Sequence, residues 1–168
     1  MNPMRQIRIE KVTLNIGAGE PGEKVDLMKE LLERITGRKV VKTKAKRRIP
    51  TWHLRPGLEI GVKVTVRGKD AKELLKKLLA AVGNKLKRSC FDKFGNVNFG
   101  VEEYIHIPGM KYDPKIGMQG LNVCVTLERP GYRVKRRKVK RSKIGKKHLI
   151  TPEEAMEFMR KEFGVVVE

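Results

Sequence analysis

The sequence predicts an α+β fold, a two-layer sandwich in which helices cover one face of a mostly antiparallel sheet and leave the other face open. Several segments alternate apolar and polar residues with the two-residue period of a strand. Two long segments between them carry apolar residues on one side only, at helical spacing. Strands combined with one-sided helices are typical of layered α+β domains.

The first strand is predicted over residues 5–16. Its apolar set is Val12, Leu14 and Ile16. Asn15 falls between these positions, so we expect it on the opposite, polar face of the sheet. The alternation slips near residues 10–11, where we expect a β-bulge.

Residues 17–22, GAGEPG, have the GxGxxG spacing of a dinucleotide-binding turn between a strand and a helix. Pro21 stands inside the turn, and Glu20 and Glu23 near its third glycine would repel a pyrophosphate. We therefore favour a plain strand-to-helix turn. A nucleotide-binding enzyme that uses Gly17–Gly22 is kept as an alternative.

The next helix is predicted over residues 23–36, with Gly37 as its left-handed cap. Its apolar stripe is Leu27, Met28, Leu31, Leu32 and Ile35. A strand follows, and one of its faces carries Arg38, Val40, Lys42 and Lys44.

Residues 42–68 join a basic loop to another strand. One face of this strand carries Ile60, Val62, Val64 and Val66, and the other carries Glu59, Gly61, Lys63, Thr65 and Arg67. A polar sheet face beside a basic loop suits phosphate and ribose, although a merely solvated outer face is the plainer interpretation. Trp52 either projects from the loop or folds back as a core anchor.

The second half of the chain repeats these patterns. Asp70 and Glu73 form a capping-box pattern that opens a helix. A strand or hairpin is predicted over 96–107, which includes His106, and a further strand over 120–128. Residues 129–147 are expected to be a tethered loop that stays irregular until RNA or a protein orders it. A last helix begins at Thr151-Pro152-Glu153-Glu154, with Thr151 as N-cap and Glu154 completing the capping box. Its expected buried side is Ala155, Met156, Met159 and Phe163.

We expect one α+β domain over residues 1–128, with 129–168 packed on it.

The charge is concentrated in two places. The chain has a net charge of +20, of which residues 38–67 contribute +9 and residues 129–147 contribute +11. Such patches indicate a polyanionic partner. No apolar run has the ~20 residues of a spanning helix, so we expect a cytoplasmic protein. No catalytic motif or metal-ligand spacing is present, so we expect no enzyme activity, no cofactor and no metal.

Five blocks carry a resemblance to a known family: LNIGAGE, TGRKVVKTKAKRRI, LRPGLEIGVKVTVRG, FDKFGNVNFGVEEYIHIPGMKYD and GMQGLNVCVTL. Together they resemble the large-subunit ribosomal protein five family, which binds 5S ribosomal RNA. Bacterial members have a helical extension before the first strand that has no counterpart here. A basic segment follows residue 128, so the archaeal type is the closer match.

The resemblance implies a structural protein of the central protuberance of the large subunit, with 5S rRNA on the open sheet face. The family's contacts fall on Asn15 and Thr65, and Arg38 stands where the family usually has Gln. With the charges around them, the expected 5S rRNA set is Asn15, Arg38, Lys42, Lys44, Lys63, Thr65 and Arg67. An RNA chaperone acting outside the ribosome is a further alternative.

The resemblance also implies a projecting loop near the peptidyl-site tRNA, and contacts with 23S rRNA, neighbouring large-subunit proteins and a small-subunit protein. The expected tRNA-proximal set is Lys46, Arg47, Arg48, Trp52, His53 and Arg55. By charge alone, we assign to other rRNA the set Arg133, Lys135, Arg136, Arg137, Lys138, Lys140 and Arg141.

Overall fold

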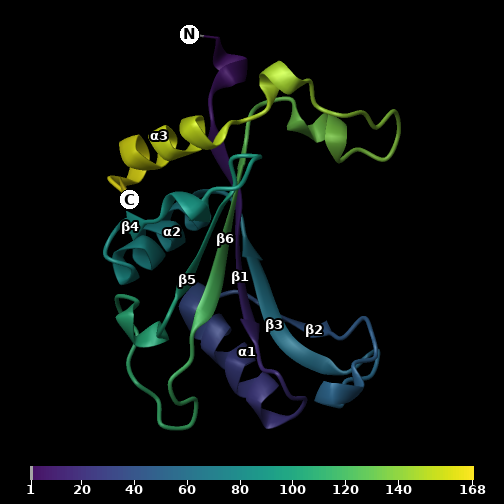
Figure 1. Cartoon of the computed structure of the whole chain (residues 1–168). Helices are drawn as coiled ribbons and strands as arrows, with labels where there is room; N and C mark the ends of the chain where they lie inside the picture. Colours follow the sequence, from purple (N-terminus) through teal and green to yellow (C-terminus); the bar gives the residue numbers. More distant parts are fainter. Residues whose placement is uncertain (1) are drawn as a thin grey trace. The chain divides into compact units, whose positions relative to one another are not determined.

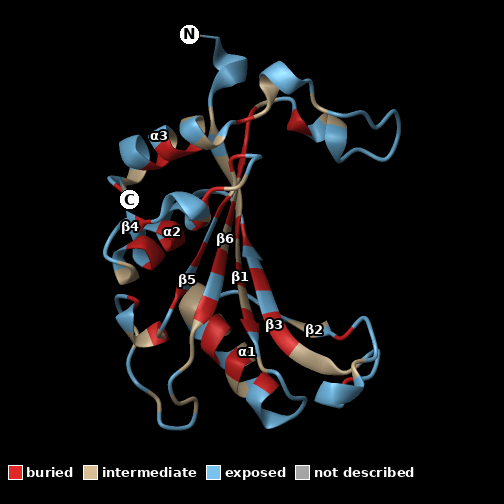
Figure 2. Ribbon diagram, in the orientation of Figure 1, coloured by how far each residue is buried: buried red, intermediate tan, exposed pale blue. Residues whose placement is uncertain are grey.

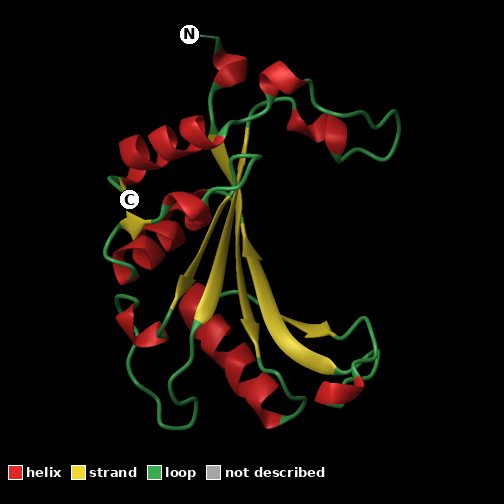
Figure 3. Ribbon diagram, viewed as in Figure 1, coloured by secondary structure: helices red, strands yellow, loops and turns green. Residues whose placement is uncertain are grey.

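A computed structural model describes residues 2–168, with three α-helices and a five-stranded sheet of order β2-β3-β1-β6-β5 (Figures 1 and 3). The sheet strands are β1 (Arg8–Gly17), β2 (Val41–Lys44), β3 (Glu59–Val66), β5 (Val97–Val101) and β6 (Leu121–Glu128). The helices are α1 (Glu23–Thr36), α2 (Lys69–Ala81) and α3 (Pro152–Phe163). The predicted α+β class is confirmed. All three helices fall short of the length and apolarity needed to cross a membrane.

The chain forms two compact units, and strands β1, β5 and β6 contribute residues to both. Unit one comprises Met1–Val12, Arg67–Phe99 and Cys124–Glu168. Unit two comprises Thr13–Val66 and Gly100–Val123.

In unit two, α1 packs against β2 and β3. The helix has the predicted bounds and ends at Gly37, whose φ of 63° lies in the left-handed region that glycine adopts without strain. It buries Val25, Met28, Leu31 and Leu32. Val25 was not in the predicted stripe, and Leu27 and Ile35 are only half-buried. Val62, Val64 and Val66 are buried as predicted, so the apolar face of β3 belongs to this core.

A β-bulge between β2 and β3 changes which residues share a face. Thr43 pairs with Gly61, but the next residue, Lys44, pairs with Glu59, so one residue of β3 has no partner. Beyond the bulge, Glu59 lies on the side of Lys42, to which it forms an ion pair at 3.0 Å. The prediction that Glu59 shares a face with Lys63 is therefore wrong, because a bulge shifts the two-residue period.

Gly61→Ala is expected to destabilise the protein by about 1–3 kcal/mol, because overpacking forces the backbone to move. A Cβ at Gly61 would lie 2.7 Å from the carbonyl oxygen of Ile16 and 2.9 Å from Oγ1 of Thr43. Gly17→Ala is the matched control, since a Cβ there meets nothing within 4 Å. Thermal unfolding of both variants tests this, and an equal melting temperature for the two would contradict it.

In unit one, α2 and α3 are joined by an ion pair of 2.5 Å between Lys72 and Glu162. The N-cap of α2 is Gly68, so the predicted capping box starting at Asp70 is wrong. At α3 the box is confirmed: Thr151 Oγ1 accepts from the N–H of Glu154, and Glu154 Oε2 accepts from the N–H of Thr151. The helix buries Ala155, Met156 and Met159, and Phe163 is half-buried.

Some of the local structure differs from the predictions. His106 belongs to a 3-10 turn, Tyr104–His106, rather than to a strand. The short strands β4 (Lys85–Leu86) and β7 (Val166–Val167), which pair in parallel, were not predicted. In β1, the Glu10 side chain is only 9% exposed and lies two residues before buried Val12, so it continues the inward set. The alternation of apolar residues is therefore interrupted here because a glutamate occupies an inward-facing position.

Candidate nucleic-acid interface

The polar faces of β1 and β3 in unit two form a surface that we call the open face, made of Thr13, Asn15, Lys63 and Thr65. Burial alternates with exposure along β3, with Lys63 and Thr65 exposed between buried valines (Figure 2). On β1, Thr13 and Asn15 are half-buried. The hydroxyls of Thr13 and Thr65 lie 3.4 Å apart, so the two strands present a joint row of hydroxyl and amide groups. Asn15 and Thr65 are thus accessible on the face where they were predicted.

Beside the open face, a polar cavity of about 540 Å³ lies in unit two. Its lining includes Asn15, Gly17, Gly100, Glu102, Gln119 and Asn122. The sequence analysis missed all of these except Asn15, because they come from the ends of three strands and the loops beside them. The isolated glycines and amides carry no motif that signals a common site.

Lys42 and Lys44 do not join the open face. The Nζ of Lys42 lies 2.8 Å from Oδ1 of Asp26, on α1, and 3.0 Å from Oε2 of Glu59. Hydrogen bonding to Asp26 and then to Glu59 raises the pKa of Lys42, and the same contact with Lys42 lowers the pKa of Asp26. Lys44 pairs with Glu59 beyond the bulge and lies on that same side. The prediction that Lys42 and Lys44 lie beside Thr65 is therefore wrong, because the strand register places them on the other side of the sheet.

The other two cations of the expected 5S rRNA set flank strands β2 and β3. Arg38 precedes β2 and is exposed. Arg67 follows β3 in unit one, and its Nη1 lies 3.4 Å from Oε1 of Glu10.

The basic loop after β2 is an ordered hairpin. Ile49 and Leu54 exchange backbone hydrogen bonds of 3.0 and 3.1 Å, and Leu54 is buried. The Trp52 side chain at the tip is 67% exposed, so the alternative of a core anchor is excluded. The loop's exposed polar set is Lys46, Arg47, Arg48, His53 and Arg55.

The basic segment, residues 129–147, is pinned at both ends. The Tyr132 hydroxyl donates to the carbonyl of His148 at 3.1 Å and accepts from the N–H of Ile150 at 3.1 Å. Burial raises the pKa of Tyr132. The guanidinium of Arg129, in a residue only 4% exposed, donates to Oε1 of Glu154 at 2.7 Å. The segment is therefore tethered at both ends, as predicted, and it is irregular except for the 3-10 turns Tyr132–Lys135 and Lys146–His148.

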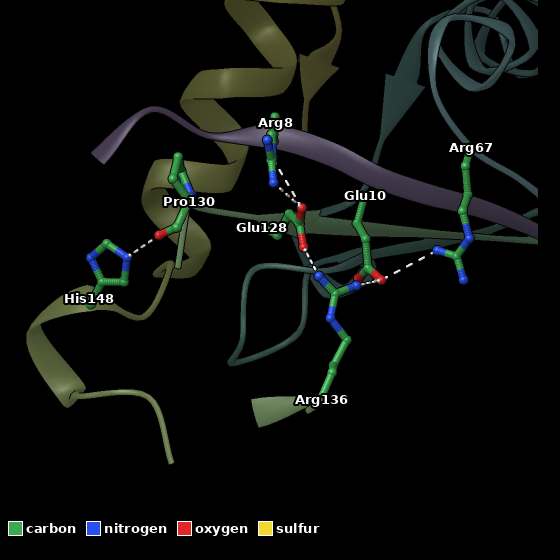
Figure 4. Close-up of polar contacts among 7 residues, drawn as sticks. All are labelled: Arg8, Glu10, Arg67, Glu128, Pro130, Arg136 and His148. Carbon is green, nitrogen blue, oxygen red and sulfur yellow. Dashed lines mark hydrogen bonds and ion pairs between the residues drawn. The ribbon is translucent and has the colours of Figure 1, made fainter. Parts of the chain in front are cut away.

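Arg136 belongs to what we call the arginine–glutamate cluster: Glu10, Glu128, Arg8, Arg67 and Arg136 (Figure 4). The side chains of Glu10 and Glu128 are 9% and 7% exposed. Arg136 donates to both, with 2.8 Å from its Nη2 to Glu128 Oε2, and Arg8 donates to Glu128 Oε1 at 2.7 Å. The cluster holds the basic segment to strands β1 and β6.

Arg136 differs from the other residues of the expected rRNA set because it forms ion pairs with two glutamates of this cluster. Its charge is compensated within the protein, and Arg137 Nε donates to the carbonyl of Lys140 at 2.8 Å. All seven residues of the set are exposed, and the five outside these contacts are Arg133, Lys135, Lys138, Lys140 and Arg141. Within residues 2–168, no group of three or more His, Cys, Asp or Glu side chains is arranged to hold a metal ion.

Comparison with known proteins gives one consistent family. Residues 2–55 match the family described as Ribosomal protein L5, and residues 59–158 match the model of that ribosomal family's C-terminus. The large ribosomal subunit protein uL5 of Nanoarchaeum equitans is 60% identical over 167 residues, which cover 99% of this chain and 98% of that protein. The uL5 proteins of Sulfurisphaera tokodaii and Nitrosopumilus maritimus are 52% and 48% identical, and each alignment covers 99% of this chain and at least 95% of the relative.

Proposed function

Because this chain belongs to the ribosomal protein L5 family, we propose that its open face binds 5S ribosomal RNA in the large ribosomal subunit. It is a ribosomal protein of the large subunit and not an enzyme. Its place of action is the cytoplasmic ribosome. The observation that carries the proposal is the row of accessible Asn15, Lys63 and Thr65 opposite the face that packs on α1.

In the proposed mechanism, the open face positions the RNA, and the basic segment supplies most of the affinity. The buried valines of β3 hold Thr65 and Lys63 at a strand spacing that is set before RNA arrives, so little ordering is needed on binding. Hydroxyl and amide groups on this surface suit the 2′-OH groups and phosphates of folded RNA. The basic segment adds a sequence-independent attraction that weakens with salt.

Two further contacts are part of the proposal. The hairpin loop, with Trp52 at its tip and basic residues around it, reaches the peptidyl-site tRNA. The exposed cations of residues 129–147 contact 23S rRNA, and the remaining surface meets neighbouring large-subunit proteins and a small-subunit protein. The exposed Trp52 and the exposed cations support these contacts, since each is accessible in the protein alone.

Thr65→Val is expected to weaken binding to 5S rRNA by about three- to tenfold, the value of one or two lost hydrogen-bonding contacts. The substitution keeps the side-chain shape and the charge, so the slope of affinity against salt should be unchanged. Filter binding at several salt concentrations measures both quantities. Thr51→Val, at an exposed position in the hairpin loop, is the matched control. Wild-type affinity for Thr65→Val would contradict the proposed surface.

Co-sedimentation separates the ribosomal role from that of a chaperone. A structural protein remains in stoichiometric amounts on large subunits after a high-salt wash. A chaperone acting outside the ribosome would be removed by the wash. If this protein were recovered only in the wash, the ribosomal assignment would be overturned.

A further inference from the structure

The polar cavity of unit two, which shares Asn15 with the open face, is a candidate site for one nucleotide. Its floor comes from three neighbouring strands: Asn15 from β1, Asn122 from β6 and Gly100 from β5. Each of these residues stands beside a buried residue of its own strand, Ile16, Leu121 or Val101. All three therefore lie on the polar face, and the cavity continues the open face.

Glycines make room for the cavity. Gly17 and Gly100 have no side chains to fill it. The volume of about 540 Å³ falls within the range of roughly 300–1,000 Å³ that small-molecule sites occupy.

The chemistry of the lining decides what the cavity can take. Among the described residues that line it there is no lysine or arginine, and Glu102 contributes a carboxylate. A phosphate would therefore meet a negative charge without a compensating cation. The amides of Asn15, Gln119 and Asn122 each offer a carbonyl acceptor beside an N–H donor. This pairing matches an exocyclic amino group next to a ring nitrogen, as on adenine and cytosine.

We propose that this cavity binds an unpaired adenine or cytosine of the RNA that occupies the open face. The inference rests on the proposed function and adds a base-specific contact to it. Bases that leave the helical stack are the parts of RNA whose edges proteins can read by hydrogen bonds. Asn122 and Asn15 pair with the amino group and ring nitrogen, and Glu102 accepts from a further amino or hydroxyl group.

Methylation by dimethyl sulfate tests the site, because it reads N1 of adenine and N3 of cytosine. In the complex of 5S rRNA with the full chain, we expect one unpaired adenine or cytosine to be protected. Gly100→Leu should restore the reactivity of that base, since the new side chain fills the cavity. Its Cβ would lie 3.8 Å from Oδ1 of Asn122, an ordinary contact, so the variant is expected to fold.

Two more variants sharpen the test. Asn122→Asp keeps the shape of the side chain but removes its donor, and it should also restore reactivity and weaken binding about tenfold. Asn98→Leu adds the same apolar side chain at an exposed position two residues from Gly100 on the same face of β5, and protection should persist.

The outcomes separate the two proposals. Protection that is equal in wild type, Gly100→Leu and Asn122→Asp overturns the base site while RNA binding stands. Binding without any protected adenine or cytosine overturns it as well. If the wild-type protein does not bind 5S rRNA, the proposed function fails, and the base site fails with it.

Discussion

Replacing Glu154 with glutamine is expected to lower the free energy of unfolding by about 1–2 kcal/mol, because the change leaves the buried charge of Arg129 without its partner; the Glu154 side chain is 40% exposed, so the loss is smaller than for a fully buried pair. The Arg129 side chain is 5% exposed and donates to Glu154 Oε1 at 2.7 Å. Its other acceptors are the main-chain carbonyls of His148 and Leu149, at 3.3 Å each, which carry no net charge. Urea unfolding followed by circular dichroism measures the change.

Two controls identify the cause of this loss. Glutamine keeps the hydrogen bond of Glu154 to the N-cap, so the capping box remains. Glu153→Gln removes an exposed carboxylate from the same first turn and should change stability by less than about 0.5 kcal/mol. Adding Arg129→Met to Glu154→Gln should recover part of the loss, because the uncompensated charge is gone. No recovery in the double variant would show that the buried charge is not the cause.

The stabilising effect of Glu154 should depend on pH. Burial by itself would raise its pKa, but the N–H of Thr151 and the guanidinium of Arg129 outweigh it and bring the pKa below the ordinary value of 4.5. A carboxyl whose pKa is lowered in the folded state contributes stability above its unfolded pKa and loses it as the pH falls through the folded one. The difference between wild type and Glu154→Gln should therefore shrink below about pH 4.5. A constant difference down to about pH 2 would exclude this linkage.

Removing three exposed cations from the basic segment is expected to weaken binding to 23S rRNA by roughly a hundredfold near 0.15 M salt. The variant replaces Arg133, Lys138 and Arg141 with glutamine, all of them exposed. Each phosphate contact contributes about 0.7–0.9 to the slope of log affinity against log salt, so the slope should fall by about 2–3.

The control for this variant removes the same charge elsewhere. Lys69, Lys77 and Lys161 are exposed on helices α2 and α3, and their replacement by glutamine should leave most of the slope intact. Arg136→Gln should change the slope by less than any exposed cation of the segment, because Glu10 and Glu128 already compensate its charge. Equal loss in both triple variants would mean that net charge alone, rather than the segment, attracts the RNA.

The sequence by itself determined the features that depend on neighbouring residues. The alternation of Val62, Val64 and Val66 gave β3 its buried face, and Gly37 ended α1 where a left-handed residue was needed. The pattern Thr151-Pro152-Glu153-Glu154 specified the start of α3 in the same local way. The accessible side of Asn15 and Thr65 followed from this periodicity.

Only the tertiary structure decided the features that depend on distant residues. A single bulge moved Glu59 to the side of Lys42 and Lys44, and no pattern in the neighbouring sequence predicts a bulge of that kind. Arg136 and Glu10 are separated by 126 positions, so their contact arises only when the segment folds back on the sheet. The cavity likewise exists only because neighbouring strands bring small and amide residues to one place. Hydrophobic periodicity determines which way a side chain points, and register and packing determine what it meets.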